Sequence, residues 1–85
     1  MPAKSLVITR KADKQISKLP KRIQLKVLNK LTTLKQNPLS GIRLSGELSG
    51  SFKIRLGDYR LVYDFHKKEN VIAILKVEHR QGVYK

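Results

Sequence analysis

The stretch that decides the fold is FKIRLGDYRLVYDF, residues 52–65, in which apolar and polar side chains alternate with a period of two. Such alternation on both sides of Gly57-Asp58 predicts two antiparallel strands joined by a two-residue II′ turn, with glycine supplying the positive φ. A loop of this length fixes the register of the hairpin. The predicted pairs are Leu56 with Tyr59, Arg55 with Arg60, Ile54 with Leu61, Lys53 with Val62 and Phe52 with Tyr63.

This register separates the hairpin into an apolar face and a cationic face. The apolar face can bury under helices and consists of Phe52, Ile54, Leu56, Tyr59, Leu61, Tyr63 and Phe65. The cationic face consists of Lys53, Arg55, Arg60, Val62 and Asp64. Antiparallel sheets often leave one polar face in water, which is one interpretation of this pattern. The other is a phosphate site, because opposed arginines repel each other unless an anion compensates them.

A third strand is predicted at VIAILKV, residues 71–77. A three-residue turn at 67–69 would pair Phe65 with Val71 and Tyr63 with Ala73, and an extra turn residue would exchange the two faces of the strand. The predicted core positions of this strand are Val71, Ala73, Leu75 and Val77. The positions predicted on the cationic face are Ile72, Ile74, Lys76 and Glu78, followed in an extended chain by Arg80 and Tyr84.

Two helices are predicted upstream of the hairpin, after a short strand at residues 5–9. The first covers 10–20 and ends at Pro20, and the second covers 21–36, where apolar residues recur with a period near 3.6. This wide apolar face comprises Ile23, Val27, Leu31 and Leu34, flanked by Leu25 and Leu28. Residues 37–51 are predicted to be a connecting loop. The order β-α-α-β-β-β indicates one α+β domain over residues 1–85, with a mainly antiparallel sheet and a two-helix hairpin packed on one face.

The composition indicates a polyanionic partner. The chain has 85 residues, and its 19 Lys and Arg against 6 Asp and Glu give a net charge of +13. It contains no cysteine, so the sequence predicts neither a disulfide nor a zinc–thiolate site. No apolar run is long enough for a membrane span or a signal peptide, so a cytoplasmic location is the default expectation.

A second cationic feature lies on the predicted helix 21–36. Arg22, Lys26 and Lys30 follow the spacing i, i+4, i+8 and form one stripe. The stripe is either a solvated outer face or a contact with RNA or ribosomal phosphates. Binding to a membrane surface is disfavoured, because the basic helices lack exposed aromatic anchors.

The catalytic options are narrow. His66 and His79 lie far apart in the sequence and no acidic residues show metal-ligand spacing, so no metal or other cofactor is predicted. No glycine-rich phosphate loop precedes a helix, and nothing indicates a serine triad. Cleavage of RNA without a metal stays open, because the substrate supplies its own 2′-OH nucleophile. The protein then needs a base, cations for the phosphate and a proton for the leaving 5′-oxygen.

The segments LSGELSGSFKIRLGDYRLVYDF and LKVEHRQGVYK resemble the RelE/ParE superfamily of bacterial toxins, and the RelE branch especially. The resemblance is strongest over residues 44–85, and the predicted β-α-α start agrees with the family's layout. It implies the toxin of a type II toxin–antitoxin system, an mRNA interferase that cuts mRNA in the ribosomal A site without a metal. It also implies a cognate antitoxin, for which the charge of this chain predicts an acidic sequence.

The resemblance also implies roles for individual residues. Lys53 matches a base or phosphate contact, and Arg55 an electrostatic contact. Arg60 matches the arginine that stabilises the transition-state phosphate. The remaining matches are Arg80, a leaving-group or phosphate contact; Tyr84, which stacks on a codon base; and His79, a candidate for acid–base work that alternation points away from the cationic face.

Two alternatives to ribosome-dependent RNA cleavage follow from the same resemblance. The ParE branch shares the fold and inhibits DNA gyrase, a protein target, without nuclease chemistry. A catalytically inactive relative that only binds RNA is the other alternative. The clustered cations and the tyrosine at position 84 favour cleavage.

Overall fold

The computed structural model describes residues 2–43 and 51–79, which form an α+β domain with one five-stranded sheet of order β1-β5-β4-β3-β2. In chain order the elements are β1 (Ser5–Ile8), α1 (Arg10–Ser17), α2 (Lys21–Gln36), β2 (Ile42–Arg43), β3 (Ser51–Leu56), β4 (Tyr59–His66) and β5 (Val71–His79). β1 runs parallel to β5, and the other neighbouring strands are antiparallel. The predicted fold class is therefore confirmed.

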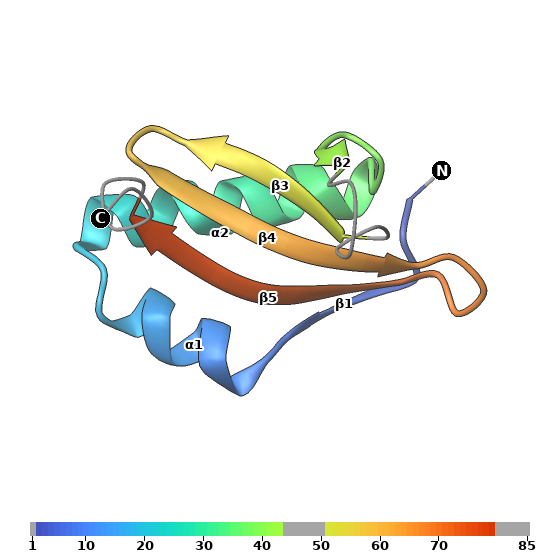
Figure 1. Ribbon diagram of the computed structural model, residues 1–85, viewed down its shortest axis with the longest axis horizontal. Helices are drawn as coiled ribbons and strands as arrows, with labels where there is room; N and C mark the ends of the chain where they lie inside the picture. Colours follow the sequence, from blue (N-terminus) through green and yellow to red (C-terminus); the bar gives the residue numbers. More distant parts are fainter. Residues whose placement is uncertain (1, 44–50, 80–85) are drawn as a thin grey trace.

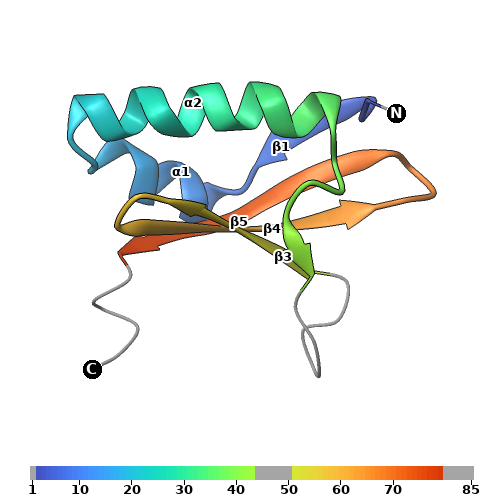
Figure 2. The same cartoon turned by 90° about the horizontal axis from the view of Figure 1, so that it is seen from above.

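Both helices lie on the same side of the sheet. Figure 1 shows α1 and α2 behind and beside the strands, and Figure 2 shows them above the sheet with its opposite face uncovered by any helix. We call the side that the helices cover the inner face and the opposite side the outer face. This arrangement leaves the outer face to polar and charged side chains.

The helix boundaries follow from local chemistry. Thr9 caps α1: its Oγ1 accepts a hydrogen bond from the Ala12 N–H at 3.3 Å and donates one to the Ile74 carbonyl at 2.8 Å. α1 ends at Ser17, before the predicted end at Pro20, and Pro20 is the N-cap of α2. The predicted bounds of the second helix, 21–36, are confirmed. Thr9 thus fixes α1 against β5.

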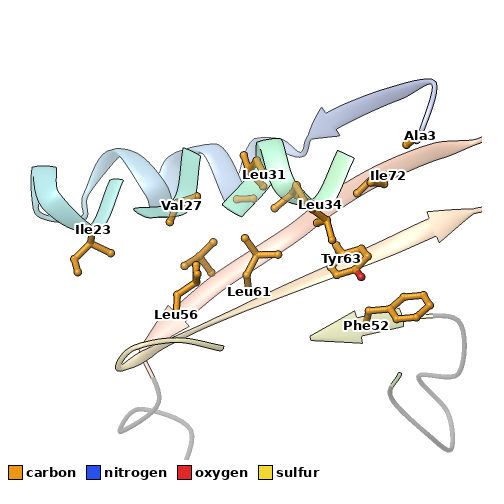
Figure 3. Packing of buried hydrophobic residues seen from close by; sticks show 13 residues of the cluster. Ala3, Ile23, Val27, Leu31, Leu34, Phe52, Leu56, Leu61, Tyr63 and Ile72 are labelled. Atoms are coloured by element: carbon orange, nitrogen blue, oxygen red, sulfur yellow. The ribbon is translucent and has the colours of Figure 1, made fainter. Parts of the chain in front are cut away.

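The core lies between α2 and the inner face of the sheet. The buried face of α2 comprises Ile23, Val27, Leu31 and Leu34. Figure 3 shows these side chains pointing toward Leu56, Leu61, Tyr63 and Phe52 of the hairpin. Tyr63, Leu61, Ile72 and Ile74 have no solvent exposure, so the hairpin and β5 supply the centre of the core.

The apolar face of α2 is narrower than the sequence predicts. Leu25 and Leu28 are 61% and 53% exposed, so the expectation that they widen the buried face is wrong. With about 3.6 residues per turn, Leu25 lies opposite the buried face of α2, whereas Leu28 lies at its margin. No helix in residues 2–43 and 51–79 is long and apolar enough to cross a membrane.

Residues 38–43, within the predicted connecting loop, are held in place by Tyr63, and the rest of that loop, 44–50, lies outside the described residues. Tyr63 donates a hydrogen bond from its hydroxyl to the buried Pro38 carbonyl at 2.7 Å and accepts one from the Gly41 N–H at 3.1 Å. These bonds place Ile42 and Arg43 beside β3, where they form the short strand β2 that the sequence did not predict. A Cβ at Gly41 would lie 2.7 Å from the Tyr63 hydroxyl, so glycine permits this close approach.

The hairpin register is confirmed at every predicted pair. Leu56 pairs with Tyr59, Arg55 with Arg60, and the pairing continues to Phe52 with Tyr63, after which Ser51 extends β3 by one residue. Gly57 has a φ of +61°, as the first position of a II′ turn requires.

The predicted register of β5 is wrong for most of its length. The turn before β5 has four residues, 67–70, and ends at Asn70, whose φ of +58° is left-handed. Phe65 therefore pairs with Ile72 and Tyr63 with Ile74. Ile72 and Ile74 lie in the core instead of on the cationic face, while the predicted core residues Val71, Ala73 and Leu75 are only partly buried.

An irregularity in β5 restores the predicted faces near its end. Tyr63 pairs with Ile74 but Val62 pairs with Lys76, so Leu75 is an extra residue in the ladder. Beyond it, Val77 pairs with Leu61 and is buried, as predicted for its face. Lys76 and Glu78 consequently lie on the outer face, as the sequence predicts.

Candidate active site on the outer face of the sheet

The outer face presents side chains in rows that cross β3, β4 and β5. The first row is Arg55, Arg60 and Glu78; the second is Lys53, Val62 and Lys76; the third is Ser51, Asp64 and Ala73. Two adjacent rows therefore carry four cations, Lys53, Arg55, Arg60 and Lys76, which we call the outer-face cations. One carboxylate, Glu78, lies within these two rows.

The positive charge of the opposed arginines is partly balanced by Glu78, which pairs with Arg60. Arg60 Nη2 donates a hydrogen bond to Glu78 Oε1 at 2.6 Å, and the two side chains are 29% and 26% exposed. Lys76 Nζ lies 3.6 Å from the second carboxylate oxygen, Oε2. The hydrogen bond from Arg60 foremost, with the charges of Lys76 and Arg60, holds the pKa of Glu78 below its ordinary value. One carboxylate thus balances two cations.

Arg60 has hydrogen-bonding capacity that Glu78 does not use. Its Nε is buried and has no hydrogen-bond partner among the described residues. Arg55, its cross-strand neighbour, is exposed and has no ion-pair partner in the same part of the chain. The row therefore retains unmatched positive charge and at least one unmatched donor, which favours an anionic ligand.

The remaining outer-face residues define the limits of the site. Asp64 accepts a hydrogen bond from the Ser51 hydroxyl, so this carboxylate is engaged at the far row rather than among the cations. Val62 lies between Lys53 and Lys76 and is 6% exposed. The site is thus a cationic surface around a buried apolar residue.

The predicted site residues fall into three groups. Lys53, Arg55 and Arg60 lie together on the outer face, as the hairpin register predicts. Arg80 and Tyr84 lie outside the described residues, and their convergence on this face stays a prediction. His79 lies on the inner side, where it pairs with Tyr59 at a ring-centroid distance of 4.9 Å and an interplanar angle of 88°. Its predicted orientation away from the cations is confirmed.

The cationic stripe of α2 meets the hairpin at a groove. A cavity of about 340 Å³ is lined by Lys26, Asn29, Lys30, Thr33, Arg55, Leu56 and Gly57. Arg22 and Lys26 line a neighbouring cavity with Gly57 and His79. The two cationic features of the sequence are therefore adjacent in space. The i, i+3, i+7 spacing of Lys26, Asn29 and Thr33 is the signal that could have identified the polar wall of the groove.

Sequence reasoning placed Lys76 and Glu78 on the correct face but gave them no role. The signal for Glu78 was its rarity, since a chain with 6 acids and 19 cations places one carboxylate opposite an arginine pair. That Glu78 lies opposite Arg60 could be recognised only from the strand register beyond Leu75.

These features define a small basic α+β protein with a cationic surface on one sheet face, and comparisons with known proteins identify its family. Residues 6–84 match the family described as "ParE toxin of type II toxin-antitoxin system, parDE". The chain therefore belongs to the RelE/ParE superfamily of toxins of type II toxin–antitoxin systems.

Its relatives include proteins with names of the RelE branch. Toxin RelG of Mycobacterium tuberculosis is 37% identical over 79 residues, which is 91% of each chain. The toxin–antitoxin complex RelBE2 of the same organism contains a chain with a TM-score of 0.85 and 35% identity, covering 94% of this chain and 100% of that one. The archaeal RelE–RelB complex of Pyrococcus horikoshii gives a TM-score of 0.76 and 29% identity, covering 94% and 97%.

Proposed function

We propose that this toxin is an endoribonuclease of the RelE type, which cuts mRNA in the ribosomal A site without a metal and so stops translation. The observation that carries the proposal is the row Arg55–Arg60 beside Lys53 on the outer face. Two opposed arginines with an unpartnered Nε are arranged for a phosphodiester, whose oxygens accept hydrogen bonds from several directions. The named relatives of the RelE branch support the same activity.

The chemistry needs three tasks from the site. A base takes the proton of the ribose 2′-OH, whose oxygen attacks the adjacent phosphorus and forms a 2′,3′-cyclic phosphate. The bond from phosphorus to the 5′-oxygen breaks, and an acid protonates that oxygen. Arg60 and Arg55 are placed to stabilise the additional negative charge of the transition state. Lys53, in the neighbouring row, is the candidate base, and Arg80 is the candidate contact to the leaving oxygen.

The groove between α2 and the hairpin extends the site. Lys26 and Lys30 line it together with Arg55, so a nucleic acid strand on the outer face can continue over the hairpin tip onto α2. Contacts of this type add salt-dependent affinity without sequence information. We assign Arg22, Lys26 and Lys30 to the binding of RNA in the ribosome.

A cognate antitoxin is part of the proposal. The relatives RelBE2 and the archaeal RelE were solved as complexes with their antitoxins. A net charge of +13 and four outer-face cations favour an acidic segment that covers the same face. Antitoxin and mRNA then exclude each other, and binding of the antitoxin keeps the toxin silent.

The experiment is primer extension on mRNA programmed into purified ribosomes, with the toxin added in EDTA-containing buffer that preserves ribosome integrity. We expect one discrete cut in the A-site codon, with a 2′,3′-cyclic phosphate on the upstream fragment. Arg60→Ala should abolish the cut, and Arg80→Ala should do the same if that residue contacts the phosphate. Arg10→Ala, at an exposed position of α1 far from the outer face, is the matched control and should cut like the wild type.

Two results would contradict the proposal. A folded wild-type protein that leaves A-site mRNA intact would remove the nuclease function. Undiminished cutting by the folded Arg60→Ala protein would remove the assignment of the site. Folding of each variant is checked by circular dichroism and thermal melting.

A second candidate is inhibition of DNA gyrase, which the ParE description of the matching family favours. Supercoiling of a relaxed plasmid by purified gyrase, with and without the toxin, separates the two functions. Intact supercoiling together with arrested translation supports RNA cleavage. Gyrase-linked DNA breaks with intact mRNA would support the ParE-type activity instead.

A further inference from the structure

Glu78 binds the outer-face cations in the way that a phosphate group would. Its two oxygens meet two different cations, Arg60 at 2.6 Å and Lys76 at 3.6 Å. The carboxylate of Glu78, on β5, thus links Arg60 of the first row, on β4, to Lys76 of the second row, on β5. A phosphodiester likewise carries two non-bridging oxygens that share one negative charge.

The guanidinium of Arg60 is only partly used by this carboxylate. Nε and Nη2 point from the same edge of the guanidinium, and an oxyanion that fits this edge accepts from both donors. Glu78 accepts from Nη2 alone, while Nε is buried without a partner among the described residues. A buried donor without an acceptor is costly, so a ligand that fills both positions binds Arg60 better than Glu78 does.

The ion pair is also accessible to a competitor. Arg60 and Glu78 keep 29% and 26% of their side-chain surface exposed, and neither of the described helices, α1 and α2, covers the outer face (Figure 2). Partly exposed pairs contribute little net stability, because water solvates the separated charges well. Replacing Glu78 by another anion on Arg60 therefore costs little free energy.

We propose that Glu78 is an internal substitute for the RNA phosphate: it occupies Arg60 and Lys76 in the free toxin and is displaced when an RNA phosphodiester binds. The inference rests on the proposed function, because it assigns the same row of cations to an RNA phosphate. Glu78 balances the charge of Arg60 without substrate and lowers the affinity for RNA, so that RNA must compete for Arg60.

The experiment measures RNA binding without cleavage. A fluorescein-labelled RNA of twelve 2′-O-methyl nucleotides, which lacks the attacking hydroxyl, is titrated with toxin at low salt, and anisotropy gives Kd. Glu78→Gln removes the competing charge and should bind about two- to fivefold tighter than the control, the range of partly exposed ion pairs. The control is Glu69→Gln, which makes the same change of net charge in the exposed turn before β5.

A double-mutant cycle tests whether the gain acts through Arg60. In an Arg60→Ala background, Glu78→Gln should give only a small part of this tightening relative to Glu69→Gln, because only Lys76, the more distant partner of Glu78, remains to be freed. Glu78→Asp is the second variant: it keeps the charge but shortens the side chain, so an intermediate gain is expected. This variant keeps the test decisive if Glu78→Gln fails to fold.

The inference is overturned if Glu78→Gln binds RNA no tighter than Glu69→Gln, or if the whole gain persists without Arg60. Weaker binding by both Glu78 variants would show that Glu78 positions Arg60 instead of competing for it. The A-site cleavage assay is scored separately. If Glu78→Gln binds RNA more tightly through Arg60 but the toxin makes no cut on the ribosome, the proposal for Glu78 stands and the nuclease function is rejected.

Discussion

At the scale of single residues, Tyr63 connects the core to the chain that precedes β3. Its ring stacks on Phe52 with centroids 5.1 Å apart, while its hydroxyl bridges Pro38 and Gly41. The same side chain therefore supplies apolar burial and the only two polar contacts that the hydroxyl needs. Phenylalanine in its place keeps the ring and removes the bridge.

Tyr63→Phe should lower the free energy of unfolding by about 1–3 kcal/mol, because the buried Pro38 carbonyl and the Gly41 N–H lose their partner. Urea denaturation at pH 7 measures the change. Tyr59→Phe is the control, since Tyr59 is only partly buried. Equal losses in the two variants would contradict the assigned role of the hydroxyl.

The same tyrosine predicts a loss of stability in alkali. Burial raises the pKa of Tyr63, and the hydrogen bond from Gly41 only partly opposes this effect. Below about pH 10 both folded and unfolded Tyr63 are protonated. Above it the unfolded chain releases the proton first, so stability falls as the pH rises toward the folded pKa. Tyr63→Phe should flatten this decline between pH 9.5 and 11 in urea denaturation.

Glu78 predicts the opposite dependence in acid. Its folded pKa is lowered by Arg60, so its contribution is complete above the unfolded pKa of about 4.3 and is lost as the pH falls through the folded pKa. Glu78→Gln should therefore be less stable than the wild type at pH 6, by about 1 kcal/mol or less. The difference should be smaller at pH 3 than at pH 6 in thermal melts, because less of the Glu78 carboxylate is ionised. A difference that is the same at both pH values would show that the charge of Glu78 contributes nothing.

At the scale of elements, the hairpin and β5 show what the sequence can predict. The β3–β4 register was predictable because a two-residue turn with glycine leaves no freedom in pairing. The β4–β5 turn was not, because HKKEN offers several turn lengths and only the left-handed Asn70 selects the longer one. The irregularity at Leu75 then moved the faces again, so Lys76 and Glu78 were placed correctly by two compensating errors.

The candidate site was predictable to the same extent. Lys53, Arg55 and Arg60 followed from the hairpin alone, whereas their compensation by Glu78 required the pairing of a third strand. The groove was not predictable, because it depends on where α2 packs relative to the hairpin. The apolar period of α2 does not specify that position. The alternation within the hairpin was therefore enough to identify the cations, whereas their partners could be identified only from the tertiary structure.

For α2, the groove predicts a defined loss of RNA affinity. Lys26→Gln with Lys30→Gln should weaken binding of the 2′-O-methyl RNA and reduce the slope of log K against log salt by about 1 to 1.4, since each phosphate contact to a single strand contributes about 0.7. Lys11→Gln with Lys14→Gln on α1 is the charge-matched control. Equal slopes for the two double variants would make the α2 stripe a solvated face.

At the scale of the whole molecule, the net charge of +13 opposes folding through self-repulsion. The melting temperature should therefore rise by several degrees between 20 mM and 300 mM NaCl, as the Debye length falls from about 20 Å to about 6 Å. Differential scanning calorimetry measures this shift. Replacing the exposed Lys11, Lys14 and Lys67 with glutamine should reduce it. A melting temperature that is insensitive to salt in both proteins would contradict the charge argument.

The central place of β5 in the sheet has a consequence for synthesis of the chain. β1 is made first but pairs with β5, which is made last among the described strands and also pairs with β4 (Figure 1). The sheet of the nascent protein therefore lacks the strand that joins β1 to β4 until residues 71–79 have left the translating ribosome, and long-range pairing of this kind closes late. We expect that nascent chains lacking β5 cannot join β1 to the β3–β4 hairpin, so the sheet is completed only after residues 71–79 have been made.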